Sequence, residues 1–288
     1  GMLAFGAGGM DVAVAMGGGA YYITMPKMFK VNLTGTLRPY VTAKDISLEL
    51  LRILSVKGGV GAIIEWGGEG IATLSVPERG TITNMGTELG ATTSIFPSDE
   101  VTRKFLAAQG REGDYVPLSS DPDAEYEKTI KIDLTKIVPT VACPHLPENT
   151  HPAAELGDIK IDQVVIGSCT NGRIEDMEAA YNVLKGKHIA KGVRGIIIPA
   201  TMAVYKECIL RGYTEAFIDA GCIVSTPTCG PCLGGYMGIL AEGERCVSTT
   251  NRNFVGRMGH VKSEVYLASP ATAAASALTG YITDPRMV

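Results

Sequence analysis

Three cysteines in two loops rich in small residues are the groups best suited to chemistry in this sequence. Cys229 and Cys232 form a Cys-x-x-Cys pair in "STPTCGPCLGG", and Cys169 stands in "GSCTNGR", sixty residues before Cys229. Loops rich in Gly, Pro and Thr bury hydrophobic side chains poorly and let the backbone approach a ligand closely. The pattern therefore indicates metal binding or thiol chemistry.

Four interpretations of these cysteines are open from the residues alone. Most free cysteines are small buried hydrophobic residues. A thioredoxin-like redox pair would use Cys229 and Cys232 and leave Cys169 without a role. Structural zinc takes four ligands, and none of the four histidines lies in these loops. An iron–sulfur cluster on three thiolates would leave one iron open to water or substrate, as a Lewis acid.

Two arginines indicate the kind of molecule that such a site would bind. Arg252 and Arg257 stand five residues apart beside a glycine in "NRNFVGR". Guanidinium groups bind carboxylates through two parallel hydrogen bonds, although a solvated loop is the simpler alternative. Together with an open iron, the pair favours a small polycarboxylate substrate. We interpret the remaining cysteines as structural: Cys143, Cys208, Cys222 and Cys246.

The composition excludes several other kinds of partner. The chain has 288 residues, of which 45% are hydrophobic and 19% charged, with a net charge of −4. Without a basic tract we expect neither nucleic acid nor an anionic membrane as a partner. No apolar run approaches the length of a membrane span and no signal peptide is visible, so we expect a cytoplasmic protein. Seven cysteines do not suggest a disulfide framework.

The elements that position the cysteines alternate regularly in the second half of the chain. Strand patterns at 161–168, 192–201 and 222–227 alternate with helix patterns at 173–186 and 202–221. This alternation predicts a parallel sheet with helices on both faces, and a last helix between Ser269 as N-cap and Gly280. Both cysteine loops then follow strands, at the sheet edge where open α/β sheets bind ligands. "VSTTNRNFVGR" is typical of a third such strand and loop.

The first half mixes short strands with helices. We expect a strand at 30–35, a helix at 42–54, a strand with Glu65 near its end, a helix up to Gly90, and a helix that begins with Ser98 as N-cap. The acidic stretch 119–128 is the best candidate for a linker. The expected domains are 1–130 and 131–288.

Several motifs together resemble the aconitase superfamily, which includes aconitase, homoaconitase and the large subunit of isopropylmalate dehydratase. In the second half they are "IGSCTNGR", "TCGPCLGG", "STTNRNFVGRMG" and "YLASPATAAASALTG". In the first half they are "GAGGMDVAVAMGGG", "SVKGGVGAIIEWGGEG" and "TITNMGTELGATTSIFP", so the resemblance covers essentially the whole chain. It implies three-layer α/β/α subdomains with mostly parallel sheets.

The resemblance also implies a set of functional residues. Cys169, Cys229 and Cys232 would hold a [4Fe–4S] cluster whose fourth iron binds substrate and water. Arg252 and Arg257 would bind substrate carboxylates. Two further residues match family positions: Glu65 an active-site glutamate near the iron-bound hydroxyl, and Asn251 an asparagine beside the cluster.

Because "GATTSIFP" resembles aconitase most, we expect the parent enzyme to be a hydro-lyase of the tricarboxylic acid cycle, aconitate hydratase. It would interconvert citrate and isocitrate through cis-aconitate. The alternatives are isopropylmalate dehydratase or homoaconitase, and, in another class, a non-catalytic iron–sulfur sensor. The family's upstream Asp-Ser-His stretch and its mobile C-terminal domain, or separate small subunit, have no match in this sequence. We therefore expect a central fragment that is inactive alone, with Gly1 before Met2 as a tag remnant.

Overall fold

The computed structural model describes residues 3–4 and 9–288, and the contacts divide the chain into two compact units. The first unit contains Gly1–Thr36 and Leu54–Lys136, and the second contains Leu37–Ile53 and Ile137–Val288. Residues 1–2 and 5–8, with the Gly1–Met2 start and the first glycines of the glycine-rich segment, lie outside the described residues. The continuous domains 1–130 and 131–288 stay a prediction.

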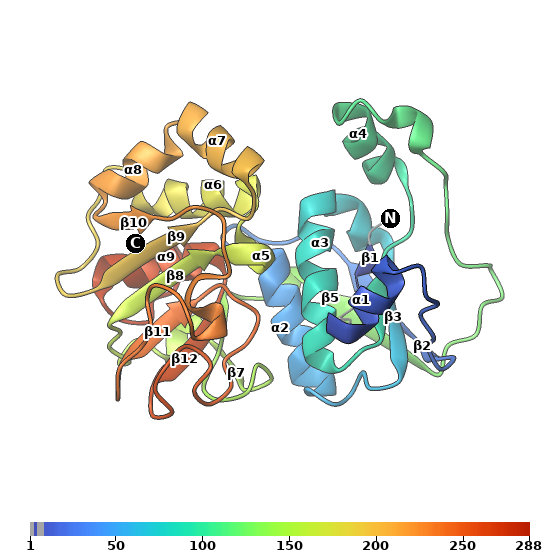
Figure 1. Cartoon of the computed structure of the whole chain (residues 1–288), viewed down its shortest axis with the longest axis horizontal. Coiled ribbons are helices and arrows are strands. Elements are labelled where there is room, and N and C mark those ends of the chain that lie inside the picture. The colour runs from blue at the N-terminus through green and yellow to red at the C-terminus, as the bar shows by residue number, and fades with distance from the viewer. Residues whose placement is uncertain (1–2, 5–8) are drawn as a thin grey trace. The chain divides into compact units, whose positions relative to one another are not determined.

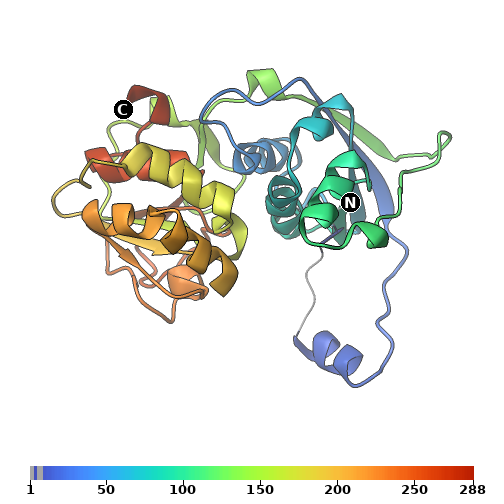
Figure 2. The same ribbon diagram turned by 90° about the horizontal axis from the view of Figure 1, so that it is seen from above.

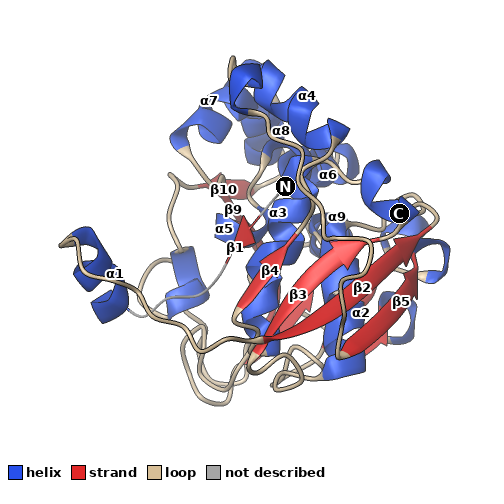
Figure 3. Cartoon of the chain, turned by 90° about the vertical axis from the view of Figure 1, so that its right-hand side faces the viewer, coloured by secondary structure: helices blue, strands red, loops and turns tan. Residues whose placement is uncertain are grey.

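The first unit is built on a five-stranded sheet with the order β1-β4-β3-β2-β5, in which only the β1–β4 pair is antiparallel. Figure 3 shows β4, β3, β2 and β5 side by side. Its strands are β1 (Leu3–Ala4), β2 (Lys27–Thr34), β3 (Ala62–Gly67), β4 (Thr93–Ile95) and β5 (Lys128–Asp133). Its helices are α1 (Gly9–Met16), α3 (Val76–Met85) and α4 (Glu100–Ala108).

The helices of this unit differ in how firmly they are held. Helix α1 has no buried residue, and in Figure 2 it stands apart from the other helices as a separate blue ribbon. Helix α3 continues into a 3-10 turn at Gly86–Leu89 and ends at Gly90, whose backbone is left-handed, as expected of a terminating glycine. Helix α4 begins one residue later than predicted, because Asp99 and not Ser98 is its N-cap.

The carboxylate of Asp99 caps helix α4 and also pairs with a buried arginine. It accepts the backbone N–H of Thr102 and also two hydrogen bonds from Arg79, at 2.9 and 2.6 Å. The Arg79 side chain is fully buried, and it also donates to the Ile71 carbonyl and lies over the Phe96 ring. A buried guanidinium requires a counter-charge, so Asp99 is the partner that lets Arg79 occupy the core.

The second unit is built on a seven-stranded sheet with the order β10-β9-β8-β11-β12-β6-β7 (Figure 1). The strands from β10 to β12 run parallel, and β6 and β7 are antiparallel to their neighbours. The strands are β6 (Thr140–Ala142), β7 (Thr150–Pro152), β8 (Gln163–Gly167), β9 (Arg194–Ile198), β10 (Cys222–Val224), β11 (Arg245–Ser248) and β12 (Glu264–Ala268). This confirms the α/β class with mostly parallel sheets.

The helices of the second unit surround these strands. They are α2 (Ala43–Leu54, of which only Leu54 falls outside this unit), α5 (Ser168–Asn171), α6 (Ile174–Leu184), α7 (Met202–Leu210), α8 (Tyr213–Asp219) and α9 (Pro270–Thr279). Helix α9 begins at the N-cap Ser269 and ends at Gly280, as predicted. The single helix expected at 202–221 is interrupted, because Gly212 adopts a left-handed backbone between α7 and α8.

The central strand β8 is buried at every residue, so both faces of the sheet are covered. On one face, Val164 and Ile166 belong to the main core with residues of α6 and α9. Figure 2 shows α6 in yellow beside α7 and α8 in orange. On the other face, above β9, lies the Cys-x-x-Cys loop (residues 225–235), where a Cβ on Gly230 would come within 2.3 Å of Ile198 Cδ1.

Among the helices that the structure describes, none has both the length and the apolar character of a membrane span.

Replacing Asp99 with asparagine should lower the free energy of unfolding at neutral pH by about 2–4 kcal/mol, because Arg79 then lacks its counter-charge. Burial acts against ionisation of Asp99, but hydrogen bonds from Arg79 and Thr102 outweigh it and hold the pKa below its ordinary value. A carboxyl with a lowered folded pKa stabilises above its unfolded pKa, and this contribution is lost as pH falls through the folded value. The deficit of the variant should therefore shrink in acid.

Urea unfolding at neutral and acidic pH measures this difference. The control is Glu100→Gln, which breaks a solvent-exposed pair with Arg103 and should change stability much less than Asp99→Asn. Equal losses in the two variants, or a deficit that persists in acid, would contradict the assignment.

Candidate functional site

The three loops that carry the candidate residues leave the sheet of the second unit at one edge. Cys169 follows β8, Cys229 follows β10, and Asn251 follows β11. These strands are parallel members of one sheet, so their carboxyl ends lie on the same side. The topology therefore brings the candidate residues of this unit to one place.

A strained turn holds Cys169 after β8. Gly167 has a φ of 125° and Ser168 a φ of 64°. A side chain on Gly167 would place its Cβ within 1.9 Å of the Ile198 carbonyl oxygen, so only glycine fits here. The turn leads directly into the short helix α5, in which the thiol of Cys169 is exposed.

The Cys-x-x-Cys loop presents its two thiols differently. Cys229 is exposed and caps the 3-10 turn Gly230–Leu233, whereas Cys232 lies inside that turn and is only 7% exposed. Burial raises the pKa of the Cys232 thiol above its ordinary value; the Arg257 guanidinium offsets part of this rise, and the charges of Cys169 and Cys229 add to it. The three thiols therefore lie close enough for their charges to act on one another.

The loop after β11 reaches Cys232. Cys232 Sγ lies 3.8 Å from Asn251 Oδ1, and Arg257 Nη2 lies 3.8 Å from the same sulfur. Arg252 directly follows Asn251 on this loop and is half-buried. The structure thus places Asn251 and Arg257 against a buried thiol.

Buried polar atoms without a hydrogen-bond partner gather in two of these loops, the one after β8 and the one after β11. Six such side-chain atoms occur in the described part of the chain, and four of them belong to Ser168, Asn171, Asn253 and Arg257. A buried polar group is normally hydrogen-bonded, so a concentration of unpaired ones marks a place where a polar ligand binds. Three thiols, an arginine and these orphaned atoms fit an anionic sulfur-ligated group.

The other cysteines do not join this arrangement. Burial raises the pKa of Cys143, Cys208 and Cys222 to about 11 and that of Cys246 to about 12, so all four stay protonated thiols at neutral pH. Among residues 3–4 and 9–288, no three or more His, Cys, Asp or Glu side chains are grouped so as to hold one metal ion, and this holds for Cys169, Cys229 and Cys232 as well.

Glu65 has surroundings of its own in the first unit. It stands opposite Lys30 in the β2–β3 register and forms an ion pair with it, and Tyr126 donates a hydrogen bond to its second oxygen at 3.1 Å. Burial opposes ionisation of Glu65, but hydrogen bonds from Lys30, Ser120 and Tyr126 outweigh it and lower the pKa. Glu65 is therefore a carboxylate at neutral pH, able to accept a proton or hydrogen bond but not to act as an acid.

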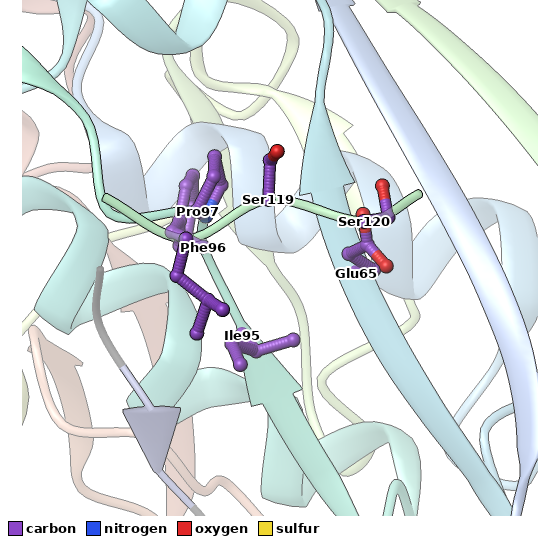
Figure 4. Close-up of a pocket in the computed structure, with 7 residues that line it drawn as sticks. Glu65, Ile95, Phe96, Pro97, Ser119 and Ser120 are labelled. Atoms are coloured by element: carbon purple, nitrogen blue, oxygen red, sulfur yellow. The ribbon is translucent and has the colours of Figure 1, made fainter. Parts of the chain in front are cut away.

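A pocket of about 240 Å³ adjoins Glu65 (Figure 4). Its walls are mostly apolar, with two hydroxyl groups beside the carboxylate, and consist of Glu65, Ile95, Phe96, Pro97, Leu118, Ser119 and Ser120. Ser120 and Tyr126 belong to the acidic stretch expected as a linker, which here covers Glu65. Because Glu65 and the cysteines belong to different units, the joint role of these residues stays a prediction.

The sequence did not reveal several buried charges, among them Lys44 and Glu88. Lys44 is fully buried, and Glu88, in the 3-10 turn after α3, is 5% exposed. The position of Lys44 could have drawn attention to it. It is the second residue of α2, and a cation in the first turn is unfavourable because it faces the positive end of the helix dipole. No local pattern marks Glu88.

The fold and the site define an α/β protein with a thiol-rich ligand site at the strand ends of a parallel sheet. The model of the aconitase family (aconitate hydratase) matches residues 1–157 and 148–280. The chain therefore belongs to the aconitase family and is part of a hydro-lyase.

Curated relatives resemble the whole chain. The 3-isopropylmalate dehydratase large subunit of Clostridium kluyveri is 53% identical over 288 residues, which is 100% of this chain and 68% of that protein. The 2,3-dimethylmalate dehydratase large subunit of Eubacterium barkeri is 53% identical, over 99% of this chain and 68% of that protein. The 3-isopropylmalate dehydratase large subunit of Helicobacter hepaticus is 54% identical with the same coverage.

A solved structure resembles the chain only distantly. It is the holo-form of Thermococcus kodakaraensis aconitase X, with a TM-score of 0.43 and 14% identity over 83% of this chain and 53% of that chain. A likeness at this level carries no argument about the chain.

The expectation of aconitate hydratase acting on citrate and isocitrate is wrong. Relatives 51–54% identical over nearly the whole chain are named 3-isopropylmalate dehydratase large subunits. In the run "GATTSIFP", Ser94 and Phe96 pack with the buried Trp66, while Ile95 and Pro97 line the pocket beside Glu65.

Proposed function

We propose that this chain is the greater part of a dehydratase large subunit that removes water from an alkyl-substituted malate, as 3-isopropylmalate dehydratase does. The observation that carries the proposal is the contact of Cys232 with both Asn251 and Arg257, at 3.8 Å each, beside the thiols of Cys169 and Cys229. A sulfur ligand site beside an arginine suits a hydroxylated dicarboxylate.

Cys169, Cys229 and Cys232 would hold a [4Fe–4S] cluster as thiolates. When bound, the cluster supplies a Lewis-acidic iron at which a hydroxyl group of the substrate is polarised. Arg257 next to Cys232 offsets part of the rise that burial causes in the pKa of that thiol, which stays above its ordinary value until a metal binds the sulfur. Asn251 Oδ1 lies 3.8 Å from Cys232 Sγ, and its side-chain amide can donate or accept a hydrogen bond.

Arg252 and Arg257 would bind and orient the two carboxylates of the substrate. Both are on the loop after β11, which holds them at the strand ends near the thiols. Fixing both carboxylates aligns the hydroxyl with the hydrogen on the neighbouring carbon, and the two leave together as water. Re-addition at the other carbon exchanges the positions of the hydroxyl and the hydrogen.

Glu65 would serve as an acceptor for the hydroxyl group, as the ionised state of its carboxylate allows. The relatives are named large subunits, so we propose a small subunit as the partner that completes the site. The two substrates in the relatives' names are both malates with alkyl substituents. We therefore propose an alkylmalate, and not one particular alkyl group, as the substrate.

Anaerobic reconstitution with iron and sulfide should give a brown species that absorbs broadly in the visible range. Serine at Cys169, Cys229 or Cys232 should abolish it, because a cluster lacking a thiolate ligand is not retained. The matched controls are Cys208→Ser and Cys246→Ser, whose thiols are buried away from the site. Retention of full iron and sulfide in any of the three ligand variants would contradict the ligand assignment.

The reconstituted large subunit with its small subunit should convert 3-isopropylmalate to an unsaturated acid, followed by ultraviolet absorbance. Turnover of 3-isopropylmalate or 2,3-dimethylmalate should exceed that of citrate or isocitrate. Arg257→Lys, which keeps the charge but not the two-pronged geometry, should raise KM by about tenfold or more. Turnover of citrate without turnover of either alkylmalate would overturn the proposed substrate class.

Glu65→Gln should reduce kcat by about a hundredfold or more if Glu65 accepts a proton or hydrogen bond in the reaction. The matched comparison is Glu88→Gln, which alters the buried carboxylate of the same unit. Activity kept by Glu65→Gln and lost by Glu88→Gln would transfer the role to Glu88. Iron content and thermal unfolding of both variants separate a catalytic loss from misfolding.

A further inference from the structure

Lys44 is a fully buried lysine at a position that neither helix formation nor packing explains. It is the second residue of α2, where its charge opposes the helix dipole. Burying an ammonium group is costly unless it is well hydrogen-bonded, and an apolar side chain would fill the same space at lower cost. The role of Lys44 is therefore sought in the hydrogen bonds of its ammonium group.

The ammonium group of Lys44 holds the backbone just after β11. Nζ donates to the carbonyl oxygen of Thr249 at 2.9 Å and to that of Thr250 at 2.5 Å. The next two residues are Asn251 and Arg252. Lys44 thus fixes the chain immediately before the loop that contacts Cys232.

Thr249 passes this constraint to the turn that carries Cys169. Its hydroxyl oxygen accepts a hydrogen bond from the Gly167 backbone N–H at 2.8 Å and donates to the Gly167 carbonyl at 3.3 Å. Its backbone N–H donates to the Val165 carbonyl at 2.9 Å. Gly167 lies two residues before Cys169. Thr249 therefore contacts both Lys44, through its carbonyl group, and the turn that carries Cys169, through its hydroxyl group.

Helix α2 is itself anchored beside Lys44. Asp45 is fully buried and accepts the backbone N–H groups of Thr42 and Thr140 at 2.8 and 2.9 Å. Thr140 is the first residue of β6, in the same sheet as β11. The ammonium group therefore projects from a fixed point, as a positioning role requires.

We propose that Lys44 is a positioning residue that sets the loop carrying Asn251 and Arg252 and, through Thr249, the turn carrying Cys169. The proposal rests on the proposed function for what these loops bind. The hydrogen bonds themselves do not depend on that function, so they can be tested separately.

Hydrogen–deuterium exchange of the protein without added iron tests the bonds directly. In Lys44→Met, which keeps the length of the side chain but not its charge, exchange should rise about tenfold in peptides covering 165–171 and 246–252, because two buried carbonyl groups lose their donor. Peptides from β9 should be unchanged. The control Ser47→Ala, on a buried serine of the same helix, should change neither region.

Thr249→Val gives a second, nearly isosteric test. It removes the hydroxyl bonded to Gly167 and keeps the carbonyl groups bonded to Lys44, so exchange should rise in 165–171 and stay unchanged in 250–252. Unchanged exchange in both regions of Lys44→Met, or an equal rise in β9, would overturn the proposal. No rise in 165–171 of Thr249→Val would overturn the relay to Cys169.

The loaded enzyme with its small subunit supplies a functional readout. Lys44→Met should raise KM for the alkylmalate about tenfold, with kcat less affected. Lys44→Ala should be partly rescued by a small alkylammonium ion, which a role in packing alone would not permit. An unchanged KM, or no rescue, would contradict the role of Lys44. An inactive wild type would refute the proposed function and leave the exchange result to decide the role of Lys44.

Discussion

Parallel pairing of β8 with β9 on one side and β11 on the other is the constraint on which the second unit depends. The register sets Val165 of β8 beside Ile196 of β9 and Ser248 of β11, so β11 ends two residues before its neighbours and all three strands end at one edge. Parallel strands need long connections, and each connection has to leave from the same edge. Loops that are far apart in the sequence therefore meet there because the strands that carry them are paired side by side in one sheet.

The cost of gathering polar loops at this edge is visible in the structure. Buried hydroxyl, amide and guanidinium atoms of Ser168, Asn171, Asn253 and Arg257 lack partners, and Ser168 adopts a left-handed backbone. Such features lower stability by roughly 1–3 kcal/mol each and persist where surrounding structure holds them in place. The buried core beneath supplies that support, since β8 and the inner residues of α9 are inaccessible to solvent. Stability from the sheet thus offsets unfavourable polar burial at its edge.

Features encoded by neighbouring residues could be predicted from the sequence, and those encoded by distant ones could not. The ends of α9, with Ser269 and Gly280, and the strands before the cysteine loops follow from local patterns. The cap at Asp99 in place of Ser98 depends on Arg79, twenty residues away in the sequence. The ion pair of Glu65 with Lys30 depends on the register of two strands. Such pairings become visible only when the chain is folded.

The bonds of Lys44 show how non-local the site is. They join residues 205 and 206 positions apart, and the segment 37–53 that contains Lys44 packs with the second unit although the chain on either side belongs to the first. Contacts of such long sequence separation carry a large loop-closure cost and form late in folding. The loops at the sheet edge therefore depend on α2 for part of their support, and so on residues from both halves of the chain. A site with this origin cannot be assigned to a contiguous stretch of sequence, even though its three cysteines lie within one.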